Sequence, residues 1–155
     1  MEILVSESAG VRYLHFGSSW VQGAMRIARP YALELEYTRA MMGFLLFCPN
    51  PADIALVGLG GGSIAKFIHR QLPETRLTAL EINPDVAAAA RAYFQLPDDD
   101  ERLEVQVGDG ARYVHENPGS QDVLLVDGYD AKRIVEALSN IDFYLACKAM
   151  LRPGG

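Results

Sequence analysis

The sequence predicts an α/β fold in which a mostly parallel sheet is covered by helices on both faces. From Asp53 onward, short apolar runs alternate with segments of helical periodicity, which is typical of parallel strands joined by helices. A glycine-rich turn, Gly58-Leu-Gly60-Gly61-Gly62, directly follows the first apolar run. An acidic residue, Glu81, closes the second run about 20 residues further on, where such folds place a ribose-binding carboxylate.

Each element of the predicted domain has its own local signal. The apolar runs predict strands over residues 54–58, 77–81, 103–107 and 123–127. Helices are expected after each strand, over residues 63–71, from Asn83-Pro84-Asp85 onward, over 111–116 and over 141–151. Asn83 suits a helix N-cap and proline suits the first helical position.

The segment before the first predicted strand divides into two parts. Residues 1–29 are expected to form a small β-hairpin appendage, because two strand-like runs are separated by the turn Ser8-Ala-Gly10. Residues 30–155 are expected to form the main nucleoside-binding domain, and they begin with a helix over 31–47. Tyr37 lies on the apolar stripe of that helix, so we assign it to core packing, with a position facing a substrate pocket as the alternative.

Composition excludes several classes of function. The formal net charge is −6 and the 14 basic residues are scattered, which argues against a nucleic-acid-binding face. No apolar run reaches the roughly 18 residues of a membrane span, and the first residues lack a signal-peptide pattern, so we expect a cytoplasmic protein without membrane contact. Cys48 and Cys147 lack metal-binding spacing and the histidines are far apart, so we expect reduced thiols and no metal site.

Acidic residues gather where the predicted strands end. Asp109 follows the third strand, Asp127 ends the fourth, and Asp130 lies just beyond it. Ligands of parallel sheets bind beyond the carboxyl ends of the strands, so these residues and Glu81 are expected to share one site with the glycine turn. Asp109 is equally well explained as a helix cap.

The order and spacing of these motifs resemble the spermidine synthase (polyamine aminopropyltransferase) family, a branch of the class I S-adenosylmethionine-dependent methyltransferase fold. The resemblance extends from Tyr13 to Gly155. Its segments, each at the place of a family counterpart, are Cys48-Pro-Asn-Pro, Gly58-Leu-Gly-Gly-Gly-Ser63, Leu80-Glu81-Ile82, Val107-Gly-Asp109-Gly110 and Val126-Asp127-Gly-Tyr-Asp130. The resemblance implies a Rossmann-like sheet whose C-terminal strands are missing or shortened in this chain.

The resemblance also implies a function and a set of site residues. It implies a transferase that moves an aminopropyl group from decarboxylated S-adenosylmethionine to a small-molecule amine, without a metal. Gly58, Gly60 and Gly61 would line the tail of the donor. Glu81 would bind its ribose hydroxyls, and Asp109 with Gly110 would face its adenine, with Gln22 near the nucleoside. Asp127 and Asp130 would flank the reacting centre, and Asp130 would accept the proton of the amine.

Three departures from the family keep other functions open. Gly61 stands where the family has an acid that favours the decarboxylated donor, and Glu36-Tyr37-Thr38-Arg39 replaces its Tyr-His-Glu-Met segment. Lys132 and Arg133 follow Asp130, where the family has a proline-containing loop over the active site. The alternatives are an S-adenosylmethionine-dependent methyltransferase with an unknown acceptor, and a non-catalytic nucleoside-binding homologue. An NAD-binding domain fits less well, because it has no use for Asp109, Asp127 and Asp130.

Association with a second copy is a further expectation. The family continues with more sheet where this sequence stops, so the chain would be a fragment or a short homologue with an open sheet edge. An open apolar edge favours pairing with another chain. We therefore expect a homodimer or a larger homo-oligomer.

Overall fold

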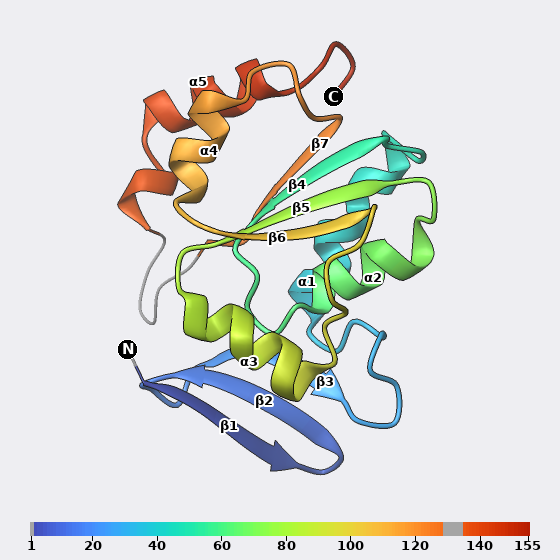
Figure 1. Ribbon diagram of the computed structural model, residues 1–155, viewed down its shortest axis with the longest axis vertical. Helices are drawn as coiled ribbons and strands as arrows, with labels where there is room; N and C mark the ends of the chain where they lie inside the picture. Colours follow the sequence, from blue (N-terminus) through green and yellow to red (C-terminus); the bar gives the residue numbers. More distant parts are fainter. Residues whose placement is uncertain (1, 129–134) are drawn as a thin grey trace.

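The computed structural model describes residues 2–128 and 135–155, and its central element is a parallel four-stranded sheet (Figure 1). The strand order is β6-β5-β4-β7, and all three pairings are parallel. The strands are β4 (Asp53–Val57), β5 (Arg76–Glu81), β6 (Leu103–Val107) and β7 (Val123–Val126). The predicted α/β class is confirmed, and because the strands run in one direction, their carboxyl ends share one edge of the sheet.

Helices cover both faces of this sheet. Side chains of α2 (Ser63–Gln71) and α3 (Pro84–Phe94) pack with β4 and β5 in one apolar core. On the other face, α4 (Gly110–Glu116), a short 3-10 helix η2 (Glu136–Leu138) and α5 (Ile141–Met150) form a second core with Ala55 and Val57. Asn83 caps α3 as expected, since its side chain accepts a hydrogen bond of 3.0 Å from the Asp85 N–H.

The helix expected over residues 31–47 is shorter than predicted. It consists of α1 (Glu36–Met41), followed directly by a 3-10 helix, η1 (Met42–Leu46). Residues 31–35 are not helical, and side chains hold them in place: Arg26 pairs with Glu34, and the Arg39 Nε donates a hydrogen bond of 2.8 Å to the Leu33 carbonyl. These side-chain contacts favour a non-helical backbone over the helical periodicity of the segment.

The N-terminal segment forms a three-stranded antiparallel sheet, with one strand more than the expected hairpin. Its strands are β1 (Ile3–Ser8), β2 (Val11–Phe16) and β3 (Val21–Arg26). Leu14, Phe16 and Met25 pack against α3, so that α3 lies between the two sheets (Figure 1). The N-terminal sheet thereby buries apolar surface that a two-stranded hairpin could not bury alone.

A buried lysine ties these layers together. The Lys66 side chain is only 1% exposed, and its Nζ donates hydrogen bonds of 2.7 Å to the Pro30 carbonyl and 2.6 Å to the Phe94 carbonyl. Burial lowers the pKa of Lys66 to about 8. Lys66 therefore joins α2 to the end of α3 and to the segment that precedes α1.

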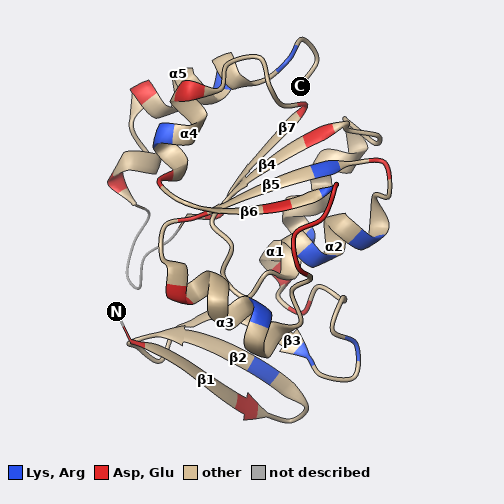
Figure 2. Cartoon of the chain, in the orientation of Figure 1, with Lys and Arg blue, Asp and Glu red and all other residues tan. Residues whose placement is uncertain are grey.

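Charged residues are distributed over the whole chain (Figure 2). Lys and Arg alternate with Asp and Glu on helices, strands and loops, and acidic residues mark the loop between α3 and β6. Within residues 2–128 and 135–155, no helix has the length and apolar character that crossing a membrane requires.

Candidate functional site

The glycine turn after β4 has a backbone that glycine adopts far more readily than other residues. Gly58, Gly60 and Gly62 have φ angles of +94°, +53° and +76°. Gly62 is the N-cap of α2, and no side chain caps that end of the helix. The loop thus leads into a helix N-terminus whose N–H groups and positive dipole end suit an electron-rich ligand.

Gly58 lies directly against the end of β7. A Cβ at Gly58 would overlap the carbonyl oxygen of Asp127 and would lie 2.7 Å from its carbonyl carbon. The Asp127 N–H in turn donates a hydrogen bond of 2.7 Å to the Val57 carbonyl. The glycine turn and Asp127, far apart in sequence, are therefore in backbone contact, as expected for neighbouring strands of one sheet.

Asp127 is a half-buried carboxylate with an altered acidity. Burial raises its pKa to about 6, because the charged form loses hydration. The Tyr37 hydroxyl donates a hydrogen bond of 3.1 Å to Oδ2 of Asp127, which lowers the pKa and opposes this effect. The assignment of Tyr37 to core packing is wrong: its side chain is 45% exposed and reaches the predicted site.

Glu81 is buried at the end of β5 and supports the glycine turn. Its Oε2 accepts a hydrogen bond of 3.1 Å from the Leu59 N–H, and its Oε1 accepts one of 3.0 Å from the Asn83 N–H. Both oxygens thus have one backbone partner. Because each carboxylate oxygen can accept a second hydrogen bond, Glu81 can hold the loop and still accept hydrogen bonds from ligand hydroxyls.

Asp109 follows β6 and acts as the N-cap of α4. Its Oδ1 accepts hydrogen bonds of 2.9 Å from the Ala111 N–H and 3.4 Å from the Arg112 N–H. The helix-cap interpretation of Asp109 is therefore correct, and its Oδ2 is the oxygen that could accept from a ligand amine. Gly110 is required by packing, since a Cβ there would lie 2.5 Å from Cγ1 of Val57.

The N-terminal sheet forms one wall of the glycine turn. A Cβ at Gly23 of β3 would lie 2.9 Å from the Gly61 nitrogen, and a Cβ at Gly60 would lie 3.0 Å from the Gln22 carbonyl oxygen. The Ser63 hydroxyl donates a hydrogen bond of 3.1 Å to the Ala24 carbonyl. The structure therefore places Gln22 beside the turn, as part of a strand whose backbone contacts the turn directly.

Gly61 lies close to the end of α3. A Cβ at Gly61 would lie 3.3 Å from the ring of Phe94, a fully buried side chain at the end of α3. A larger side chain at this position would have to displace the Phe94 ring. The packing thus explains why glycine is suitable at position 61.

Two contributors to this site were not assigned to it from the sequence: Tyr37, for which a pocket-facing position was only the alternative, and Gly23, which was not singled out. A glycine within a strand often marks a close backbone approach, and Gly23 carried that signal. Tyr37 carried no comparable signal, because its partner is 90 residues further along the chain. The predicted residue Asp130 lies outside the described residues.

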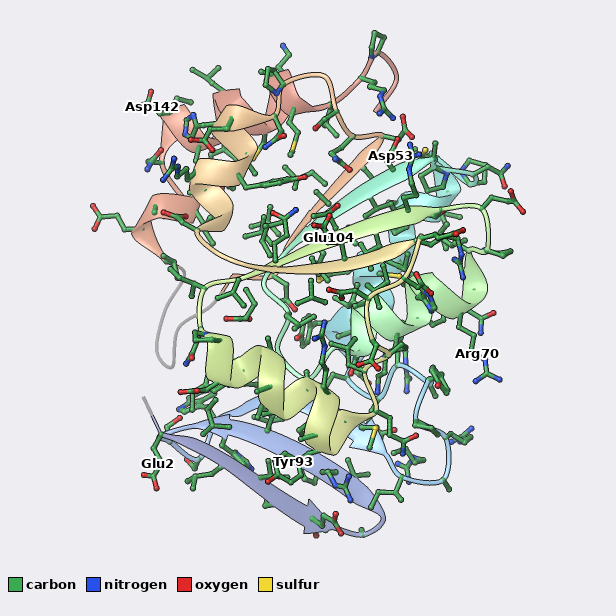
Figure 3. All side chains as sticks on the ribbon, in the orientation of Figure 1. Glu2, Asp53, Arg70, Tyr93, Glu104 and Asp142 are labelled. Atoms are coloured by element: carbon green, nitrogen blue, oxygen red, sulfur yellow. The ribbon has the colours of Figure 1, made fainter. Side chains whose placement is uncertain are left out.

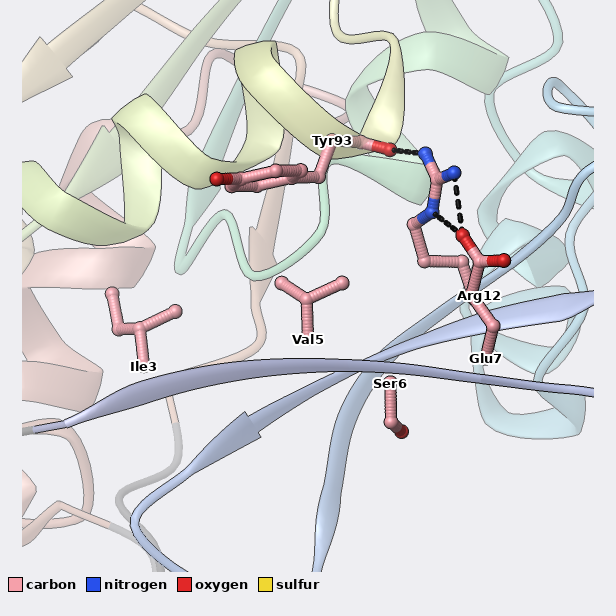
Figure 4. A pocket seen from close by; sticks show the side chains of 6 residues that line it. All are labelled: Ile3, Val5, Ser6, Glu7, Arg12 and Tyr93. Carbon is pink, nitrogen blue, oxygen red and sulfur yellow. Dashed lines mark hydrogen bonds and ion pairs between the residues drawn. The ribbon is translucent and has the colours of Figure 1, made fainter.

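Two other features lie apart from these strand ends. Asp53 lies at the amino end of β4 (Figure 3). It accepts from Arg76 at 2.8 Å and pairs with Arg152 at 2.9 Å. A groove of about 590 Å³ lies between β1 and α3, where Tyr93 lies over Val5 (Figure 4). Neither feature contains a predicted site residue. In the described part of the chain, no three His, Cys, Asp or Glu side chains are grouped to hold a metal ion.

Comparison with solved structures defines the class of this fold. A probable spermidine synthase from Corynebacterium glutamicum superimposes with a TM-score of 0.83 at 20% identity, covering 96% of this chain and 56% of that one. Human methyltransferase-like protein 13, in complex with SAH, superimposes with a TM-score of 0.67 at 28% identity, covering 78% of this chain and 62% of that one. The fold is thus the Rossmann-like fold of methyltransferases and related transferases.

Sequence comparison then gives the family. Residues 34–155 match the model of the spermine/spermidine synthase domain. The polyamine aminopropyltransferase of Chromobacterium violaceum is 47% identical over 154 residues, which cover 99% of this chain and 59% of that protein. The chain therefore belongs to the spermine/spermidine synthase family, and it spans less than two thirds of the length of this relative.

Proposed function

We propose that this chain carries the donor site and the proton-accepting group of an aminopropyltransferase, which moves an aminopropyl group from decarboxylated S-adenosylmethionine to an amine. The main support is the half-buried Asp127, whose pKa is raised to about 6 and which lies beside the glycine turn. The names of the relatives support polyamine synthesis as the pathway class. They do not favour the methyltransferase alternative.

The proposed donor site uses the residues at the carboxyl ends of the strands. Glu81 would accept hydrogen bonds from the ribose hydroxyls, and Oδ2 of Asp109 would accept from the adenine amino group. The remaining contacts would come from Gln22 and from the glycines of the two turns, which are Gly58, Gly60, Gly61 and Gly110. This assignment is consistent with the carboxylate oxygens that the backbone leaves able to accept further hydrogen bonds.

The proposed chemistry is an in-line displacement at carbon. The amine nitrogen forms a bond to the aminopropyl carbon next to the sulfonium, the carbon–sulfur bond breaks, and its electron pair stays on sulfur in methylthioadenosine. An alkyl amine has a pKa of about 10.4 and arrives protonated, so a carboxylate must attract it and accept its proton. Asp127 suits both tasks, because a base with a raised pKa holds a proton more readily. Asp130, to which the family resemblance assigns proton acceptance, is proposed as the second carboxylate and as the alternative proton acceptor.

The same proposal covers the organisation of the protein. We propose that residues 1–29 act as a wall of the donor site and that residues 30–155 form the nucleoside-binding domain. We also propose a cytoplasmic homodimer or larger homo-oligomer. Exposed apolar side chains at the end of η1 and on α5, such as Leu46, Phe47 and Ile141, are consistent with association. Sedimentation equilibrium would test it, and a monomer at all concentrations would contradict it.

Calorimetric titration tests the donor site directly. Decarboxylated S-adenosylmethionine, S-adenosylmethionine and methylthioadenosine are each titrated into the protein. We expect the decarboxylated donor to bind more tightly than S-adenosylmethionine, and we expect transfer to putrescine or a longer polyamine when both substrates are present. Tighter binding of S-adenosylmethionine would favour methyl transfer. Binding of none of the three would refute the nucleoside site.

A further inference from the structure

The C-terminal end of α3 is capped by two cationic side chains from different layers. The last carbonyl groups of a helix have no N–H partner within the helix, and a positive charge is favourable there. Arg12 of β2 donates to the Tyr93 carbonyl (Figure 4), and Lys66 of α2 donates to the Phe94 carbonyl at 2.6 Å. This end of α3 is therefore bound both to the N-terminal sheet and to α2.

The same end of α3 supports the glycine turn. A Cβ at Gly61 would lie 3.3 Å from the Phe94 ring, and a Cβ at Gly62 would lie 3.0 Å from Cδ1 of Leu96. Both of these apolar side chains are buried. The Lys66 N–H also donates a hydrogen bond of 2.9 Å to the Gly62 carbonyl. Lys66 thus belongs to the helix that the turn opens, and its side chain holds the element against which the turn packs.

Lys66 also holds the start of the segment that leads to α1. Its Nζ donates a hydrogen bond of 2.7 Å to the Pro30 carbonyl. Four residues further along α2, the Arg70 guanidinium lies 4.4 Å from the centre of the Tyr31 ring. Residues four apart lie on the same face of a helix, so one face of α2 holds both residues. The Lys66 ammonium group therefore connects three segments that meet near the glycine turn.

Lys66 has no carboxylate partner in the described part of the chain. Its hydrogen-bond partners are two carbonyl oxygens, and burial is the cause that lowers its pKa to about 8. Its charged form is therefore held by carbonyl groups alone. The charged side chains on the elements packed around it have other partners or lie at the far end of α3: Arg12 pairs with Glu7, Arg26 with Glu34, His69 with Asp100 and Arg91 with Asp99, Arg70 lies over Tyr31, and Asp85 lies in the first turn of α3.

We propose that Lys66 is a positioning residue of the donor site: its ammonium group joins the Phe94 and Pro30 carbonyls and so keeps the Phe94 ring in place against Gly61 when a nucleoside is bound. This inference rests on the proposed function. A charged donor makes shorter and stronger hydrogen bonds than a neutral amine. Loss of the proton therefore loosens this connection, although the neutral amine is less costly to bury. The affinity for the nucleoside is thus highest while Lys66 is charged.

The first test is the pH dependence of methylthioadenosine binding, measured by calorimetry from about pH 7 to about pH 9.5. We expect the wild-type dissociation constant to rise about fivefold over this range as Lys66 loses its proton. Lys66→Met should bind weakly at both ends of the range, without this rise. Lys148→Met removes an exposed lysine of α5 and is the matched control, which should keep the wild-type profile.

The second test uses the wild-type protein. Coupling between two binding events is reciprocal, so bound methylthioadenosine should lower the acid dissociation constant of Lys66 by about fivefold to tenfold. Carbon NMR of protein labelled at lysine Cε follows this titration, and the Lys66 signal is the one that titrates near pH 8 in the free protein. The Lys148 signal should titrate identically with and without the ligand.

The outcomes separate this inference from the proposed function. If methylthioadenosine binds but leaves the titration of Lys66 unchanged, the positioning role is overturned and the donor site stands. Equal pH profiles of affinity in the wild type and in Lys66→Met would overturn it in the same way. Absence of binding at every pH would refute the donor site itself, and the inference with it.

Discussion

Replacing Gly58 with alanine should destabilise the protein through two separate effects. The first is backbone strain, because φ is +94° at Gly58, a conformation that costs a residue with a side chain about 1–3 kcal/mol. The second is overlap, because the new methyl would lie 2.7 Å from the Asp127 carbonyl carbon, where optimal carbon contacts are about 3.5–4.0 Å. Overpacking of this kind typically costs about 1–3 kcal/mol, so we expect a total loss of about 3 kcal/mol or more.

Gly119→Ala separates the two effects. Gly119 also has a positive φ, +64°, but a Cβ there would meet nothing within 4 Å. This variant should therefore show strain alone, a loss of about 1 kcal/mol. The measurement is urea unfolding of the wild type and both variants, where a loss of 3 kcal/mol lowers the midpoint by about 1–2 M. Equal losses in the two variants would refute the claim that Gly58 is required for the close approach of β7.

Three further predictions concern charged side chains. Asp127→Asn should abolish aminopropyl transfer. It should also stabilise the fold by about 2 kcal/mol above pH 6, because burial raises the pKa of Asp127 to about 6 and so disfavours the charged carboxylate in the folded protein. This gain in stability should vanish below about pH 4, and equal stability of wild type and variant at pH 7 would contradict the prediction. Glu81→Gln should weaken methylthioadenosine binding about tenfold or more in calorimetry, because a charged acceptor is lost, and unchanged affinity would remove Glu81 from the donor site. Burial lowers the pKa of Lys66 to about 8 in the folded protein. Above pH 8 the unfolded chain therefore binds more protons than the folded one, and the free energy of unfolding should rise from pH 8 to about pH 10. That rise should be absent in Lys66→Met, and parallel pH profiles would contradict the assignment.

The parallel sheet was predictable because its signals are local. Apolar runs marked each strand, and the turn and cap residues between them marked where the helices begin. The predicted span 103–107 matches β6; β5 and β7 differ from the prediction by one residue at one end, and β4 by one residue at each end. The non-helical segment 31–35 was not predictable in this way, because Arg26 and Arg39 make contacts with it that its periodicity does not show.

The candidate site could be predicted only in part, for a similar reason. Glycines and acids at strand ends are visible in the sequence, since the parallel topology alone places them at one edge. The contacts of Tyr37 with Asp127, and of β3 with Gly61, depend on how separate layers dock on one another. Asp109 shows why the helix-cap and ligand-binding interpretations could not be separated from the sequence. One of its carboxylate oxygens caps α4, while the other can still accept a hydrogen bond from a ligand.

The backbone contact between Gly23 and Gly61 links ligand binding to the attachment of the N-terminal sheet. Under the proposed function, a nucleoside held by the turn would favour the conformation against which β3 packs, so detaching the sheet would also require releasing the ligand. Saturating ligand should therefore slow hydrogen exchange at amides of β1 and β2, which lie beyond β3 and far from the ligand itself. Strands β1 and β2 would then report on occupancy of a site to which they contribute no proposed ligand contact.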